Sequence, residues 1–257
     1  MISLLYYLYE RRLLRQVRHG AVPRHVGIIL DGNRRYARQR GLADPGDAYR
    51  LGAQKLDEIL EWCADLRIAA VTLWVFSTEN LKRTPAEVNG ILSVIEAKLV
   101  QLAQAARIHS LGVRVRAVGK LDALPDSILS AIRVAEQATA AHNTMVLTIA
   151  VAYGGRQEIA DAVGALLRER AKQGENLEAI IDNITEEAIA RYLYTTDLPD
   201  PDLIIRTSGE IRLSGFLLWQ SAYSEFYFCD VYWPAFRKID FLRAVRTFQQ
   251  RDRRFGR

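Results

Sequence analysis

Runs of β-branched and apolar residues alternate along the chain with segments whose apolar residues recur every three or four positions. The runs with the length and composition of buried strands are residues 25–30, 69–76, 113–118, 145–153, 202–207 and 225–233. Helical patterns fall between them at residues 49–66, 84–108, 126–141 and 156–173. This alternation predicts an α/β fold with a central, mainly parallel β-sheet surrounded by helices.

The chain is expected to fold as a single domain. Its 257 residues are 49% hydrophobic, enough for one sizeable core, and no repeat, low-complexity tract or long linker interrupts them. We divide it into an N-terminal helix, residues 1–20, and a domain of residues 21–257. Within that domain, Thr84, Pro85 and Glu87 predict an N-cap, a first-turn proline and a capping-box acid, and Gly112 marks the point where that helix has ended.

Basic residues concentrate at both ends of the chain. Residues 1–40 carry nine Arg against two acids, and residues 243–257 carry six Arg against one Asp, so the middle is net acidic. Such patches favour polyanionic partners, either phosphates or an anionic membrane surface. Nucleic acid is not expected, because no motif that reads RNA or DNA is present.

The first twenty residues predict an amphipathic helix that is too short and too basic to cross a bilayer. Its apolar face carries Leu5, Tyr9, Leu13 and Val17, and its basic face carries Arg11, Arg15 and Arg18. The helix either packs on the protein body or lies on a membrane surface. The two cysteines, Cys63 and Cys229, read as buried thiols in a reducing compartment, so we expect a cytoplasmic protein, with peripheral contact at the inner face of the cell membrane left open.

Polar clusters follow several of the predicted strands. They are "DGNRR" at 31–35, "FSTENLKR" at 76–83, "YGGRQE" at 153–158 and "RTSGEIRLSG" at 206–215. Ligands of open parallel sheets bind beyond the carboxyl ends of the strands, so these clusters are the candidate site.

Asp31 begins the cluster with the clearest chemistry. Its carboxylate can hold a hard cation, and the helix that starts after Gly32 presents free N–H groups to an anion. A helix end contributes only about 0.3–1 kcal/mol toward an anion. Arginines, at roughly 1.5–3 kcal/mol per charged hydrogen bond, and Mg²⁺ on Asp31 would therefore be needed to hold a diphosphate. Arg206 and Arg212, with Ser214, predict a second phosphate site, and hence two phosphorylated substrates or one long dianionic ligand.

Five segments resemble the signature regions of the cis-prenyltransferases, the undecaprenyl diphosphate synthase family. They are "HVGIILDGNRRYA", "FSTENLKR", "AYGGRQEI", "PDPDLIIRTSGEIRLSGFLLWQSAYSEFYFCDVYWPAF" and "RDRRFGR". The resemblance is greatest to short-chain (Z)-prenyl diphosphate synthases such as (2Z,6E)-farnesyl diphosphate synthase. It implies the cis-prenyltransferase fold and a Mg²⁺-dependent condensation of isopentenyl diphosphate with geranyl or farnesyl diphosphate, giving a Z-prenyl diphosphate of about C15.

The resemblance also implies roles for individual residues. Asp31 and Glu225 match the metal-contacting carboxylates. The positions matching the reacting centre are Asp31, Asn33, Ser77, Glu79 and Asn80. Those matching the allylic diphosphate site are Gly32, Asn33, Arg34, Arg35 and Arg83. Those matching the isopentenyl diphosphate site are Arg206, Arg212, Ser214, Arg254 and Gly256. In the family the last two reach a partner subunit's site, which implies a homodimer.

Some positions depart from the family pattern. The Arg and His that many members carry before the next helix are absent from "GLADPGDAYRLGA", and Arg50 or Arg38 is a candidate replacement. Val75 replaces a smaller residue and would shorten a product tunnel, although a long-chain polyprenyl diphosphate synthase remains the alternative. Aromatic side chains of the strands could line that tunnel or belong to the core: Trp74, Phe76, Trp219, Tyr223, Phe226, Tyr227 and Phe228.

Other classes are less well supported. A non-catalytic partner subunit would have lost the aspartate motif, which is intact here, and trans-type prenyltransferases need paired aspartates that this chain lacks. The proton acceptor stays open between Asp31, Asn33 as an orienting group, and the substrate's own diphosphate. The starter and the regular or irregular mode of coupling also stay open.

Overall fold

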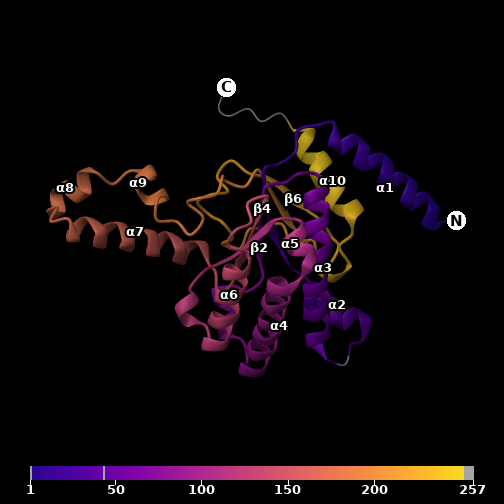
Figure 1. Cartoon of the computed structure of the whole chain (residues 1–257), viewed down its shortest axis with the longest axis horizontal. Coiled ribbons are helices and arrows are strands. Elements are labelled where there is room, and N and C mark those ends of the chain that lie inside the picture. The colour runs from indigo at the N-terminus through magenta and orange to yellow at the C-terminus, as the bar shows by residue number, and fades with distance from the viewer. Residues whose placement is uncertain (1, 43, 252–257) are drawn as a thin grey trace.

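The computed structural model describes residues 2–42 and 44–251 (Figure 1). Within them, six strands form one sheet in the order β3-β4-β2-β1-β5-β6. The strands are β1 His25–Ile29, β2 Ala70–Trp74, β3 Val113–Val118, β4 Met145–Ala150, β5 Leu203–Arg206 and β6 Glu225–Phe228. Every neighbouring pair is parallel. The α/β prediction is confirmed, and the sheet is wholly rather than mainly parallel.

Helices surround this sheet and connect its strands. Their bounds are α1 Ile2–Arg18, α2 Asn33–Arg40, α3 Pro45–Asp65, α4 Pro85–Gln104, α5 Ala106–Ser110, α6 Asp126–Thr139, α7 Gly155–Lys172, α8 Leu177–Asp182, α9 Glu186–Ala190 and α10 Lys238–Gln249. Short 3₁₀ helices occupy Thr78–Lys82 (η1), Leu121–Ala123 (η2) and Trp233–Ala235 (η3). In Figure 1, α7, α8 and α9 extend away from the body as an arm.

The prediction of a single helix over residues 84–108 is wrong, because the helix breaks at Ala105. Ala105 has an extended backbone, with φ −70° and ψ 112°, between α4 and α5. The ring of His109 lies 2.9 Å from the Ala103 carbonyl, which a continuous helix would have bonded itself. The side chain thus gives the freed carbonyl a partner at the break.

The inner strands β1, β2 and β5 are buried on both faces, as parallel strands covered by other elements must be, whereas the edge strands β3 and β6 are only partly buried. Because side chains alternate along a strand, Val26 and Ile28 of β1 join the large core formed with α3, α4, α6 and α10. Ile29 points to the opposite face, where it packs with Phe216 and Leu217. The polar clusters predicted as the site lie at the carboxyl ends of the strands.

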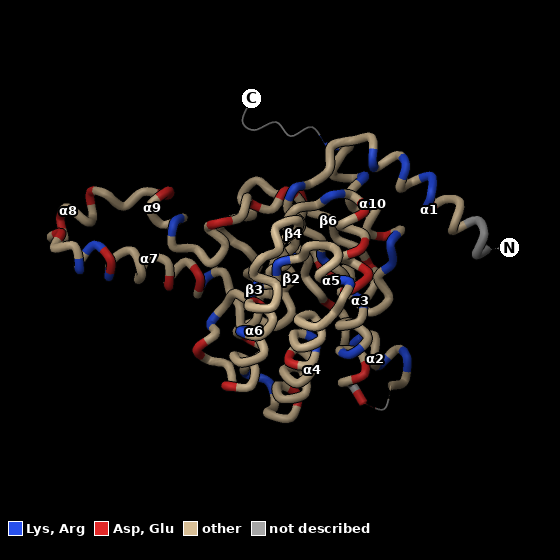
Figure 2. Tube along the Cα trace, viewed as in Figure 1, with Lys and Arg blue, Asp and Glu red and all other residues tan. Residues whose placement is uncertain are grey.

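The amphipathic helix predicted at the N-terminus is present as α1. Its second half packs against α10, where Leu13 and Val17 are buried and Gln249 Nε2 donates to the Val17 carbonyl (2.7 Å). Tyr6 and Tyr7 are exposed nearer the N-terminal end, and basic residues recur along the helix (Figure 2). None of the helices in residues 2–42 and 44–251 combines the length and apolarity of a membrane crossing.

Candidate active site

Asp31 lies just beyond β1 and is fixed by the loop that follows β5. Its amide donates to Thr207 Oγ1 (3.0 Å), and that hydroxyl donates to the Asp31 carbonyl (2.7 Å). Since β1 and β5 are neighbours in register, Ile29 opposite Arg206, the residues after both strands meet at one edge. The structure therefore brings together the two clusters that begin at Asp31 and Arg206.

Two guanidinium groups bind the Asp31 carboxylate. Arg206 Nη2 lies 2.8 Å from Oδ2, and Arg35 Nη2 lies 3.3 Å from Oδ1. Burial by itself would raise the pKa of Asp31, but the hydrogen bond and charge of Arg206, followed by the charge of Arg35, outweigh it and hold that pKa below its ordinary value. Asp31 is therefore ionised at neutral pH.

Each arginine has a second set of partners that fixes its direction. Arg35 donates to Ser208 Oγ (2.6 Å) and Glu210 Oε1 (2.9 Å). Arg206, whose side chain is only 5% exposed, donates to Ser214 Oγ (2.9 Å) and to the Arg212 carbonyl (2.5 Å). Both groups are thus held in place before any ligand arrives.

The loop after β5 is strained where it supports these arginines. Ser208 has φ +80° and Ser214 has φ +51°, the left-handed region that non-glycine residues seldom adopt. Each of these strained serines is a hydroxyl partner of one of the two arginines. Strain of about 1–3 kcal/mol per residue persists only where the surroundings impose it and is concentrated at functional sites.

Gly32 lets the backbone turn from β1 into α2 beside this loop. Its φ is +105°, and an added Cβ would lie 2.7 Å from the Tyr232 ring and 3.0 Å from Ser208 Cβ. Both the conformation and the close approach exclude a side chain, so the motif requires glycine at this position.

The "FSTENLKR" segment, which follows β2, contributes polar groups from the other side. Ser77 and Asn80 form a reciprocal capping box, with Asn80 N 3.2 Å from Ser77 Oγ and Ser77 N 3.1 Å from Asn80 Oδ1. Arg83 Nη1 donates to Glu87 Oε1 (2.7 Å) and to the Tyr49 hydroxyl (3.2 Å).

The capping role predicted for Glu87 is only half correct. Thr84 is the N-cap and accepts from the Glu87 amide (3.4 Å), and Pro85 opens α4. The Glu87 carboxylate, however, contacts Arg83 and Arg34 rather than the Thr84 backbone. Two nearby guanidinium groups attract the carboxylate more strongly than one peptide N–H.

These segments enclose a polar cleft of about 550 Å³. Its lining includes five guanidinium groups, from Arg34, Arg35, Arg38, Arg83 and Arg206, and two carboxylates, from Asp31 and Glu210. The lining is therefore net positive, and this balance favours a polyanionic ligand.

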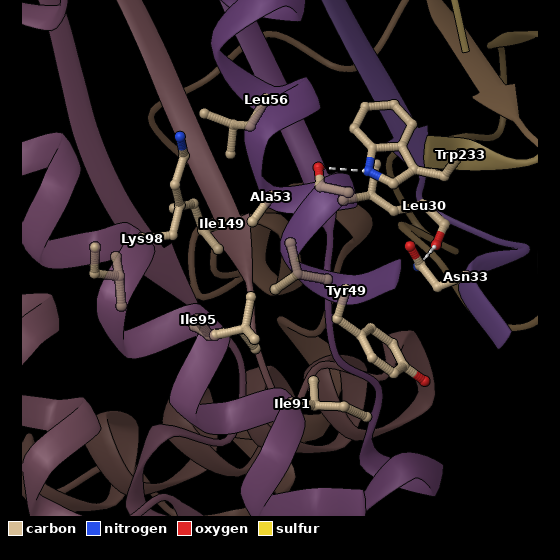
Figure 3. Close-up of a pocket in the computed structure, with 14 residues that line it drawn as sticks. Leu30, Asn33, Tyr49, Ala53, Leu56, Ile91, Ile95, Lys98, Ile149 and Trp233 are labelled. Atoms are coloured by element: carbon tan, nitrogen blue, oxygen red, sulfur yellow. Dashed lines mark hydrogen bonds between the residues drawn. The ribbon is translucent and has the colours of Figure 1, made fainter. Parts of the chain in front are cut away.

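A second, apolar cavity of about 60 Å³ opens from this cleft between α3 and α4 (Figure 3). Both spaces are lined by Leu30, Asn33, Tyr49, Val75 and Ile91, so they meet there. The further lining is largely aliphatic: Ala53, Leu56, Val94, Ile95, Leu99 and Ile149, together with Gly52, Lys98 and Trp233. A charged cleft that continues into an apolar cavity suits a ligand with an anionic head and a hydrocarbon tail.

The remaining predicted residues lie in several places. Arg38 lines the cleft, whereas Arg50 is bound to Asp44 and Asp47 at the start of α3. Glu79 is exposed and is not among the residues that line the cleft. The Arg212 side chain is 58% exposed and pairs with Glu210, so only its carbonyl contacts Arg206.

Glu225 is not brought to Asp31 within one chain. It opens β6 opposite Leu203, at the amino edge of the sheet, and its carboxylate pairs with Arg251. Arg254 and Gly256 lie outside the described residues. Within one chain, therefore, the clusters that begin at Asp31 and Arg206 lie together, and Glu225 lies apart from them.

Ser208, Glu210 and Tyr49 contact arginines that line the cleft, although they were not among the predicted site residues. The first two fall inside the "RTSGEIRLSG" cluster, so their position after β5 was the available signal. Tyr49 lies on α3, far from any strand end, and only the packing of α3 beside α4 places its hydroxyl 3.2 Å from Arg83.

A magnesium ion fits Asp31 only in company with a phosphorylated ligand. Within residues 2–42 and 44–251, no group of three His, Cys, Asp or Glu side chains could hold a metal by itself. Mg²⁺ commonly binds one or two carboxylates and completes its shell with waters and substrate phosphates. The Asp31 carboxylate lines the cleft and its side chain is 28% exposed, so it meets that requirement.

Comparisons of this chain with a family model and with known proteins agree on one family. Residues 29–256 match the model described as "Putative undecaprenyl diphosphate synthase". The isoprenyl transferase of Thermus thermophilus is 55% identical over 98% of this chain and 96% of its own length. The (2Z,6E)-farnesyl diphosphate synthase of Thermobifida fusca is 52% identical over 98% and 97%. The tritrans,polycis-undecaprenyl-diphosphate synthase of Methanopyrus kandleri is 54% identical over 98% and 92%.

A solved structure shares the fold. The crystal structure of lavandulyl diphosphate synthase from Lavandula x intermedia, in complex with dimethylallyl diphosphate, superimposes with a TM-score of 0.83 at 32% identity. The match covers 92% of this chain and 99% of that one.

Proposed function

Because this chain belongs to the undecaprenyl diphosphate synthase family of prenyltransferases, we propose that it condenses isopentenyl diphosphate with an allylic diphosphate to give a Z-prenyl diphosphate. Its relatives by sequence and by structure are prenyl-transferring enzymes, and it is a prenyltransferase. The catalytic domain would comprise residues 21–257.

One observation carries the proposal. The Asp31 carboxylate is held between Arg206 and Arg35 in a cleft that continues into an apolar cavity. A diphosphate would lie among the guanidinium groups, and the prenyl chain would enter the space between α3 and α4. When bound at Asp31, Mg²⁺ would neutralise charge on the departing diphosphate.

The proposed reaction is an electrophilic alkylation. The allylic C1–O bond breaks and releases pyrophosphate, the double bond of isopentenyl diphosphate attacks C1, and a proton leaves C2 as the Z double bond forms. Arg35 would stabilise the departing anion, and Arg206 with Ser214 would hold the second diphosphate. Asn33 Oδ1 is buried without a hydrogen-bond partner among the described residues, which supports an orienting role for Asn33. Asp31 and the substrate's diphosphate are the other candidates for the proton step.

We propose a short product of about C15 made from geranyl diphosphate. The small volume of the apolar cavity and the position of Val75 at its entrance support this length. The Thermobifida relative has the corresponding name. A longer polyprenyl product is the second candidate, favoured by the name of the Methanopyrus relative.

Assembly and location are part of the proposal. A homodimer would bring the C-terminal residues and Glu225 to a partner's site, and Leu177 and Ile181 on the arm are exposed apolar residues that suit an interface. The protein is proposed to be cytoplasmic. The exposed tyrosines and arginines of α1 support peripheral contact with an anionic membrane.

The test is to incubate the purified protein with Mg²⁺ and labelled isopentenyl diphosphate, supplying dimethylallyl, geranyl or farnesyl diphosphate separately. Chromatography and mass spectrometry identify chain length, double-bond geometry and any irregular coupling. A C15 Z product from geranyl diphosphate supports the proposal, products of C50 or longer favour the second candidate, and no incorporation with any starter points to a non-catalytic subunit.

A further inference from the structure

One charged side chain interrupts the apolar wall between α3 and α4. Lys98 is the charged residue among the described residues that line the cavity, and Figure 3 shows it on the side opposite Asn33. It belongs to the buried face of α4 with Ile91, Ile95 and Leu99. A lysine on such a face is unusual and needs a partner.

The Lys98 ammonium group has a complete set of acceptors. Nζ lies 2.7 Å from both carboxylate oxygens of Asp57 and 3.0 Å from Gln101 Oε1. The Lys98 side chain is 8% exposed and that of Asp57 is 44% exposed. The ion pair therefore spans from the cavity wall to the solvent side of α3, and no donor of the ammonium remains for another ligand.

The ion pair lies at the end of the cavity farthest from the polar cleft. Along α4, Ile91 lines both spaces and Lys98 follows seven residues later, a rise of about 10 Å. Along α3, Tyr49 lines both spaces, and Leu56, next to Asp57, lines only the cavity. Both helices thus run from the cleft toward the Lys98–Asp57 pair.

We propose that the Lys98–Asp57 ion pair closes this cavity and sets the upper limit of product chain length. The inference rests on the proposed function, in which the hydrocarbon tail grows away from Asp31. A tail that reached Lys98 would have to separate the pair and leave a charge against hydrocarbon, which is strongly unfavourable. Val75 acts at the entrance by size, whereas Lys98 acts at the end by charge.

The test compares Lys98→Met with the wild-type protein, using Mg²⁺, labelled isopentenyl diphosphate and each allylic starter. Methionine keeps the length of the lysine stem and removes the charge. We expect products at least one isoprene unit longer than the wild-type limit, enriched about tenfold or more. Lys98→Arg keeps the charge and is expected to keep the wild-type limit.

Lys238→Met is the matched control. Lys238 begins α10 and pairs at 2.7 Å with Asp65 of α3, the helix that also carries Asp57. The side chains of Lys238 and Asp65 are 22% and 40% exposed, and Lys238 does not line the cavity. Its product lengths should equal those of the wild type. Lys98→Met leaves the Asp57 carboxylate without its partner and could lower the melting temperature. In that case the Asp57→Asn/Lys98→Met double variant, which removes both charges, is used for the same product analysis.

Unchanged product lengths in a folded, active Lys98→Met protein would overturn the inference and leave the proposed function standing. A wild-type protein that forms no prenyl product with any starter would instead overturn both, so the two failures are distinguishable.

Discussion

The polar cleft and the apolar cavity meet at Asn33 and Val75 but are built by different means. In the cleft, hydrogen bonds connect residues at the carboxyl ends of the neighbouring strands β1 and β5. Arg206, for example, donates to both Asp31 and Ser214. The cavity is a space between α3 and α4 whose wall consists mainly of side chains on helix faces. Ligand binding in the cleft would therefore depend on the directions of hydrogen bonds, and binding in the cavity would depend on its volume and polarity.

This difference separates rate from product length. A charged hydrogen bond in the cleft has few acceptable replacements, because its donor and acceptor are both held by other contacts. An aliphatic side chain on a helix face can be exchanged for another with a modest effect on stability. We therefore expect cleft substitutions to change turnover and cavity substitutions to change chain length.

Asp31→Ala should have the largest effect and tests the cleft directly. Removing the carboxylate takes away the proposed magnesium ligand and leaves Arg206 without its anion, so turnover should fall by about three orders of magnitude. Steady-state kinetics with saturating Mg²⁺ measure this change. Asp47→Ala, which removes an exposed acid paired with Arg50, should leave turnover nearly unchanged. Near-normal turnover in a folded Asp31→Ala protein would sink the proposed role.

Arg206→Lys should have a smaller effect in the same region. Lysine keeps the charge but cannot reach Asp31, Ser214 and the Arg212 carbonyl at once. Losing one charged hydrogen bond lowers kcat/KM for isopentenyl diphosphate by about 10- to 150-fold. Arg116→Lys is the control, since Arg116 of β3 also bonds a carbonyl and a carboxylate but lies outside the cleft. Equal losses in the two variants would contradict a specific role for Arg206.

Val75 tests the cavity side of the comparison. Val75→Ala should lengthen the product and Val75→Phe should shorten it, because the residue lies where the two spaces meet. We expect the ratio of neighbouring chain lengths to change by about 10- to 200-fold, the usual range for small volume changes in an apolar pocket. Product analysis by mass spectrometry measures the ratio. Val146→Ala, in β4 and away from both linings, should not change it, and a changed rate with an unchanged length ratio would break the separation.

The sequence predicted the strands and the cleft better than the cavity, for a physical reason. Parallel strands are buried on both faces, so their β-branched runs are conspicuous, and the carboxyl-edge rule then points to Asp31 and Arg206. The order β3-β4-β2-β1-β5-β6 depends on where each crossover places its strand, which local composition does not encode. The prediction for Glu225 followed a family motif, and one chain places it at the amino edge.

Val75 was predicted to border the product tunnel, and it does line the cavity. The aromatic side chains of the strands were left open between the tunnel and the core. Of these, Trp74 and Phe76 line the polar cleft, and the apolar cavity is lined mainly by aliphatic residues of α3 and α4. The spacing of Ile91, Ile95 and Leu99 predicts a buried face but does not distinguish a core from a cavity wall, because both require apolar side chains. Lys98 on that face was the available signal.

The smallest expected difference between the two regions is in pH dependence. Burial opposes ionisation of Asp31, but Arg206 and Arg35 hold its pKa below the unfolded value of about 3.9. A lowered pKa stabilises the folded state above the unfolded pKa, and this stabilisation is lost as pH falls through the folded value. The difference in free energy of unfolding between wild type and Asp31→Asn should therefore stay constant at neutral pH and shrink below about pH 4. Val75→Ala, which removes no titrating group, should show a constant difference over the same range. Urea titrations at several pH values measure both, and a difference for Asp31→Asn that grows on acidification would mean that burial, not the arginines, controls this carboxyl group.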